Sequence, residues 1–113
     1  MPATYKGSPA AVNYARINNA AAAGDTVVVA GVAGQSVRVY GLRLSVAGAT
    51  IVSIKDGAGT VLEVFNFAGA GVAPPLDLRD ETYYTTVSGN GLIVNSSAAV
   101  QVDGRLEYFQ GKA

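Results

Sequence analysis

Short runs of β-branched and aromatic residues alternate with breaks rich in Gly, Asp, Asn or Pro between Val27 and Phe109. The runs recur at about ten-residue intervals, a spacing typical of β-sandwiches and small barrels. We therefore expect a single all-β domain over residues 12–113, an antiparallel β-sandwich of roughly eight or nine strands. Before it lies Met1 to Ala11, whose prolines, glycine and serine predict an extended N-terminal arm.

In Gln35 to Ala47 the apolar positions change phase at Gly41. They are odd-numbered before this glycine and even-numbered after it, namely Val37 and Val39 and then Leu42, Leu44 and Val46. A pattern of period two slips by one residue only where a strand bulges or bends. We expect the corner at Gly41, which can adopt dihedral angles that other residues resist, in a strand that passes from one sheet to the other.

Other segments have clear strand or turn patterns. Asp25 to Val32 is apolar at most positions, which predicts a strand covered on both faces. Thr50 to Phe67 predicts a hairpin that turns at Asp56–Gly59. The Pro74-Pro75 pair predicts an edge strand at Leu76 to Leu78. The remaining expected strands are Val12 to Asn18, Thr82 to Val87, Leu92 to Asn95 and Ala98 to Tyr108, with a loop at Asn19 to Gly24.

Charge and hydropathy argue against several kinds of partner. Eight basic and eight acidic residues give a net charge of zero, so no field attracts the protein to nucleic acid or to an anionic membrane. No apolar run approaches the roughly eighteen residues of a transmembrane helix. Charged residues make up only 14% of the chain, against about 25% in soluble domains. We therefore expect no nucleic acid and no membrane partner, and a homo-oligomer in which other subunits or proteins cover part of the surface.

The usual catalytic side chains are missing. The sequence has no histidine and no cysteine, so its serines have no base of the usual kind to activate them. Asp77, Asp80 and Glu81 lie close together, but their spacing does not match a calcium loop, and a solvated turn in which Arg79 pairs locally explains them better. We expect a protein that is not an enzyme, with no catalytic residue, no metal site and no cofactor.

Four residues are candidates for contacts with other subunits. Tyr83 and Tyr84 are adjacent, and neighbours in a strand point to opposite faces, so one of the two is expected at a surface or subunit contact. In the arm, Tyr5 is the expected anchor, and Pro9 lowers the entropy that is lost when the arm lies extended on a partner.

Two stretches carry a resemblance to a known family. They are VRVYGLRLSVAGATIVSIKDGAG, from Val37 to Gly59, and GNGLIVNSSAAVQVDGRLEY, from Gly89 to Tyr108. Within Val27 to Phe109 the chain resembles a group of small tailed-phage virion proteins that decorate or cement the capsid. The resemblance implies a jelly-roll-like sandwich on the outer capsid surface of the virion, assembled as a trimer or, less favoured, a dimer, and bound to the major capsid protein.

A second function remains open beside capsid decoration. A tail-associated or receptor-binding β-sandwich would recognise carbohydrate with Tyr, Asn and Asp side chains at its loop tips. The location of the protein on the head or on the tail of a virion separates the two hypotheses.

Overall fold

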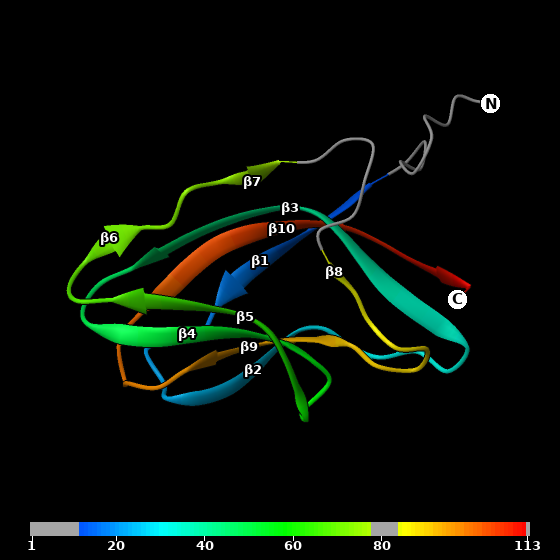
Figure 1. Ribbon diagram of the computed structural model, residues 1–113, viewed down its shortest axis with the longest axis horizontal. Coiled ribbons are helices and arrows are strands. Elements are labelled where there is room, and N and C mark those ends of the chain that lie inside the picture. The colour runs from blue at the N-terminus through cyan, green and yellow to red at the C-terminus, as the bar shows by residue number, and fades with distance from the viewer. Residues whose placement is uncertain (1–11, 78–83, 113) are drawn as a thin grey trace.

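The protein is described by a computed structural model over residues 12–77 and 84–112, in which two antiparallel β-sheets pack face to face (Figure 1). The expected all-β sandwich is confirmed. The strands are β1 Asn13–Asn18, β2 Gly24–Val29, β3 Gln35–Val46, β4 Thr50–Asp56, β5 Thr60–Phe67, β6 Gly71–Val72, β7 Leu76–Asp77, β8 Tyr84–Thr85, β9 Leu92–Ser96 and β10 Val102–Lys112. The described ten exceed the expected eight or nine because β6, β7 and β8 are separate pairs of residues.

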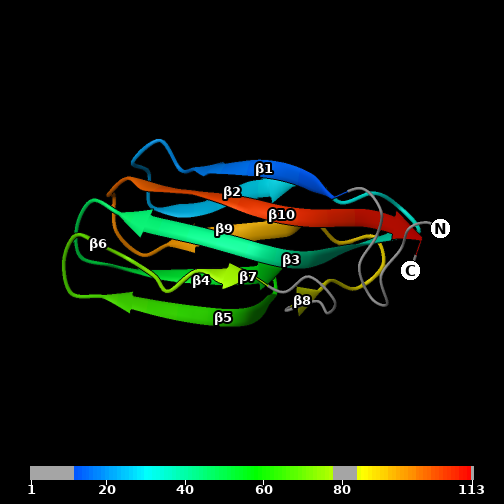
Figure 2. The same cartoon turned by 90° about the horizontal axis from the view of Figure 1, so that it is seen from above.

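Each sheet has a simple order. The six-stranded sheet runs β1-β10-β3, and β6, β7 and β8 each pair with β3 beyond it. The four-stranded sheet runs β2-β9-β4-β5. Figure 1 shows the two sheets as separate layers, with β10 and β3 above β9 and β4, and Figure 2 shows the same strands from above. The chain therefore changes layer at each of its first three connections.

The core lies between the two layers. Alternate residues of the central strands point inward, as the pleat of a β-strand requires. The side chains that are fully buried there come from both sheets and include Ile17, Val37, Val39, Val52, Ile54, Leu92, Val102 and Leu106.

The phase change in β3 is a bulge, as expected. Leu42 is opposite Leu106 and Val39 is opposite Tyr108, so Tyr40 is an extra residue on β3. Val39 and Leu42 are therefore both buried in the core. Gly41 does not have a positive φ, so this bulge does not depend on the special dihedral angles that glycine can adopt. The expectation that the strand changes sheets is also wrong, since all of β3 stays in the six-stranded sheet.

Several other strand predictions need correction. β2 is not covered on both faces: it is an edge strand, and Val27 is 61% exposed. The last strand begins at Val102 instead of Ala98 and continues to Lys112. The hairpin is confirmed, with β4 and β5 joined at 57–59 and Gly57 at a φ of 61°. β7 pairs with β3 after the two prolines, although Leu78 lies outside the described residues.

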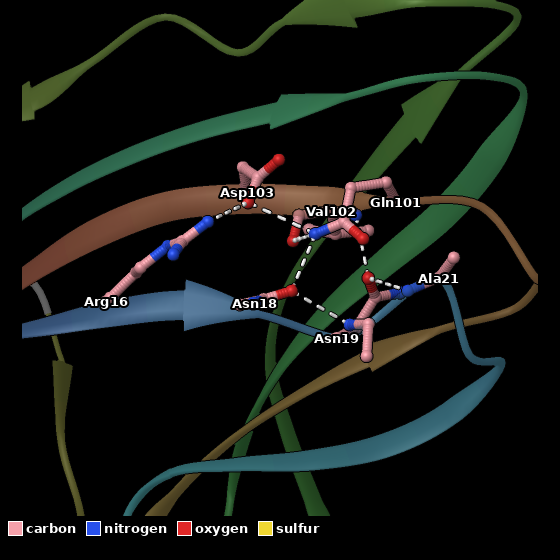
Figure 3. A network of polar contacts seen from close by, with 8 residues as sticks. Arg16, Asn18, Asn19, Ala21, Gln101, Val102 and Asp103 are labelled. Carbon is pink, nitrogen blue, oxygen red and sulfur yellow. Dashed lines mark hydrogen bonds and ion pairs between the residues drawn. The ribbon is translucent and has the colours of Figure 1, made fainter.

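A tight turn joins β1 to β2, where a loop was expected. The amide of Ala22 donates to the carbonyl of Asn19 at 3.0 Å, and Ala20 and Ala21 have φ values of 54° and 56°. Two alanines in this region cost on the order of 1–2 kcal/mol each. The side-chain oxygens of Asn18 and Asn19 offset the cost by accepting the amides of Ala20 and Ala21 at 2.9 and 3.1 Å (Figure 3).

Candidate interaction surface

The outward side of the four-stranded sheet is lined by aliphatic side chains. Val52 and Ile54 of β4 are buried in the core, so the residues between and beside them point outward. Directly opposed residues of antiparallel strands share a face. One row therefore crosses all four strands, and it consists of Val27, Ile93, Lys55 and Val61.

We call five residues of this side the aliphatic face: Val27, Ile51, Val61, Val64 and Ile93. The first four lie between 45% and 61% exposed. Ile93 is only 8% exposed, yet it does not belong to the core cluster, so its cover comes from neighbours on the outer face. Polar side chains are interspersed among them, since Lys55 lies between Ile93 and Val61 in the row. Exposed aliphatic side chains gathered on one face are a common feature of protein interfaces.

The charges on this side neutralise one another. The Lys55 ammonium lies 3.1 Å from Asp25 Oδ1, and Asn95 Nδ2 donates to the same oxygen at 2.7 Å. The hydrogen bond from Asn95, followed by that from Lys55, holds the pKa of the Asp25 carboxyl below its ordinary value. The Asp25–Lys55 pair has no net charge, which lowers, without removing, the desolvation cost of covering it with an apolar partner.

Replacing Asn95 with alanine is expected to raise the pKa of Asp25 toward the ordinary value of about 3.9. Because the pKa of Asp25 is lowered in the folded protein, its hydrogen bonds with Asn95 and Lys55 stabilise the fold above about pH 3.9. This stabilisation of the fold is lost as the pH falls through the folded-state pKa of Asp25. An NMR titration of the Asp25 carboxyl carbon measures the shift. Asn66→Ala, an exposed asparagine of β5, is the matched control. An unchanged Asp25 pKa in Asn95→Ala would contradict the assignment.

The aliphatic face continues to an open strand edge. β5 is the last strand of its sheet and pairs only with β4 among the described strands (Figure 2). Its sequence, TVLEVFNF, has no proline and a single charge, Glu63. A bulge at Leu62 interrupts its pairing with β4, but residues 64–67 follow without a further register shift, so this part of the edge can pair with another strand. Beside it lies a groove of about 510 Å³ between the sheets, lined in part by Phe65, Phe67, Val72 and Pro74. The edge and the groove can both accept atoms of a second chain.

Of the four contact residues predicted from the sequence, the structure describes only Tyr84. Tyr84 is only 8% exposed, packs in the core cluster and donates from its hydroxyl to Glu63 Oε1 at 3.1 Å. The sequence prediction placed one of the two adjacent tyrosines at a surface or subunit contact, and Tyr84 is a buried one whose side chain joins the two sheets. Tyr5, Pro9 and Tyr83 lie outside the described residues.

The aliphatic face is not evident from the sequence. Its strongest signal is the valine run of β2, which by composition predicts a buried strand. An edge strand with one side packed on the core and the other exposed has the same composition when both sides are aliphatic. Only the strand order separates the two cases.

No other kind of site stands out in residues 12–77 and 84–112. Over these ranges no three side chains of His, Cys, Asp or Glu gather into a possible metal site. The same part of the chain contains no helix long and apolar enough to cross a membrane. Comparison with protein-family models and with curated proteins finds no match to this chain.

Proposed function

We propose that the protein is a structural virion protein that decorates the outer surface of a bacteriophage capsid and binds both its own copies and the major capsid protein. The observation that carries the proposal is the aliphatic face, which lies on a side of the sheet where Asp25 and Lys55 neutralise each other and which reaches the open edge at β5 through Val61 and Val64. Such a surface suits permanent contacts, because the buried centre of an interface is apolar and poor in charge.

The strand order also supports a jelly-roll-like sandwich, the architecture that the family resemblance implies. Jelly rolls divide their strands between two sheets that are linked by Greek-key connections. In this chain the orders β1-β10-β3 and β2-β9-β4-β5 bring strands from the two ends of the sequence side by side in both sheets. Capsid decoration by such a sandwich requires no catalytic group. It requires a stable fold and surfaces that bind neighbouring proteins.

Self-association is the part of the proposal that is easiest to measure. We expect the purified protein to sediment as an oligomer at micromolar concentration, with a trimer favoured over a dimer. The double variant Val61→Lys and Val64→Lys places two charges on β5 and the aliphatic face, and we expect it to sediment as a folded monomer. Val87→Lys, which changes a valine that is 65% exposed in a loop, is the matched control. A monomeric wild type, or a double variant that remains oligomeric, would contradict this interface.

A second prediction concerns Met1 to Ala11, which lies outside the described residues. We propose that this arm docks on a neighbouring subunit or on the capsid, with Tyr5 as its anchor. A chain that starts at Val12 is expected to keep the thermal unfolding of the sandwich but to occupy fewer sites on bare capsids than the full chain does. The measurement is the number of copies bound per capsid. Equal occupancy by the two chains would contradict the proposal that the arm attaches the protein to the capsid.

A further inference from the structure

The outward side of the six-stranded sheet carries a row of three arginines. Arg16 of β1 is directly opposite Arg105 of β10, and Arg105 is directly opposite Arg43 of β3. Residues paired in this way share a face, and adjacent strands are only about 4.8 Å apart. Three guanidinium groups therefore leave the same side of the sheet from neighbouring strands.

Folding alone gives no reason for this row, because like charges directly opposite one another destabilise a sheet. Two of the three arginines have partners that reduce the cost. Arg16 Nη2 is 3.2 Å from Asp103 Oδ1. Arg105 lies 4.9 Å from the centre of the Tyr14 ring, and its Nη2 is 3.6 Å from Glu107 Oε2. Arg43 is exposed and has no ion pair or hydrogen bond with any described residue.

The nearby carboxylate of Asp103 is already in use. Its Oδ1 accepts from Arg16 and also from Gln101 Nε2 at 3.1 Å, and Gln101 Nε2 donates in addition to Asn18 Oδ1 at 2.7 Å. Figure 3 shows Asp103 between Arg16 and Gln101. These contacts direct Oδ1 of Asp103 toward β1. Within residues 12–77 and 84–112, no ion pair neutralises the positive charge of Arg43, which can therefore attract a carboxylate of another molecule.

A hollow adjoins Arg43. It has a volume of about 290 Å³ and is lined by Arg43, Leu44, Ser45, Val72, Ala73, Pro75, Asp103 and Gly104. The acidic Asp103 therefore borders the hollow together with Arg43. Val72 is 74% exposed there and is opposite Ser45. The volume is at or below the lower end of the range for small-molecule sites, about 300–1,000 Å³, so it suits one or two side chains better than a large ligand.

We propose that Arg43, supported by the arginine row, and this hollow bind an extended segment of another protein in which an acidic side chain is next to an apolar one. The carboxylate is held by the guanidinium of Arg43, whose planar fork suits two parallel hydrogen bonds. The apolar neighbour fills the hollow against Val72 and Pro75. This inference goes beyond capsid decoration and does not depend on it.

A protein segment fits this surface better than a nucleic acid does. Asp103 and Glu107 lie on the same side of the sheet as the arginines and would repel a continuous line of phosphates. The chain as a whole also has no net charge to attract a polyanion. A peptide can instead place a single carboxylate at Arg43 without running a line of negative charge past Asp103 and Glu107.

The test uses the full chain and a fluorescein-labelled synthetic peptide of alternating glutamate and leucine, with binding followed by fluorescence anisotropy. We expect saturable binding that Arg43→Gln weakens about tenfold or more, since a charge-assisted pair of hydrogen bonds is lost. Val72→Asp is expected to weaken binding as well, because it places a like charge in the hollow. Arg38→Gln is the matched control: Arg38 is on the same side but lies over Phe109 at 5.9 Å, beyond the bulge.

Thermal unfolding shows that each variant is folded before its binding is compared. Removing one charge from a row of like charges is expected to leave the melting temperature of Arg43→Gln unchanged or slightly raised. Three results would overturn the proposal: no saturable binding of the Glu-Leu peptide, an equal loss in Arg38→Gln and Arg43→Gln, or tighter binding of a thymidine oligonucleotide or of a Lys-Leu peptide than of the Glu-Leu peptide.

Discussion

Replacing Leu106 with alanine is expected to lower the free energy of unfolding by about 2–5 kcal/mol. Leu106 is completely buried on β10, the strand between β1 and β3, and it is directly opposite Ala15 on one side and Leu42 on the other. The shortened side chain leaves a cavity that the surrounding strands fill only in part, because hydrogen bonds to two neighbours hold β10 in place. Domains of this size are stable by only about 5–15 kcal/mol, so the loss is a large fraction of the total.

Urea unfolding followed by circular dichroism measures this change. Val87→Ala is the control, because Val87 is 65% exposed and a surface truncation is expected to change stability by no more than about 0.5 kcal/mol. A loss at Leu106 as small as that at Val87 would mean that the interior between the sheets is not packed as described.

The second large effect is expected at Asn19, which is 5% exposed. Its Nδ2 donates to the carbonyls of Val100 and Ala22 at 2.8 and 3.0 Å, and its Oδ1 accepts the amides of Val102 and Ala21 at 2.8 and 3.1 Å. Alanine removes all four bonds and leaves the buried amide of Val102 without this partner. Each buried group left unpaired costs about 1–3 kcal/mol, so we expect a loss on the order of 3 kcal/mol.

Asn18→Ala is a closely matched control for Asn19→Ala. Asn18 is the preceding residue and is exposed, although its Oδ1 also accepts two hydrogen bonds, from the amide of Ala20 and from Gln101 Nε2. Water replaces these partners, so we expect a loss below about 1 kcal/mol. The same urea experiment compares the variants. Equal losses at the two positions would show that the buried network does not hold the turn together.

The sequence was sufficient where local chemistry decides the structure. The change of phase around Gly41 predicted a bulge, since the two sets of apolar residues can reach one core only if an extra residue separates them. Likewise, Asp56 and Gly57 predicted the turn between β4 and β5, because a positive φ is most easily adopted by glycine.

The sequence was insufficient where strand order decides the structure. The valines of β2 have the composition of a buried strand, yet β2 is an edge strand with Val27 exposed. The arginine row depends on pairings between residues that are far apart along the chain, such as Arg16 with Arg105. The alternation at Tyr83 and Tyr84 showed that one must point inward, but only the packing identifies Tyr84 as the buried one.

Cryo-electron microscopy of virions that contain this chain tests capsid decoration most directly. We expect density for the two-layered sandwich at regular positions on the outer surface of the head. We also expect the aliphatic face and β5 to be turned toward neighbouring copies or toward the capsid protein. Density for the sandwich on the tail, or a head whose outer surface lacks it, would contradict the proposed function.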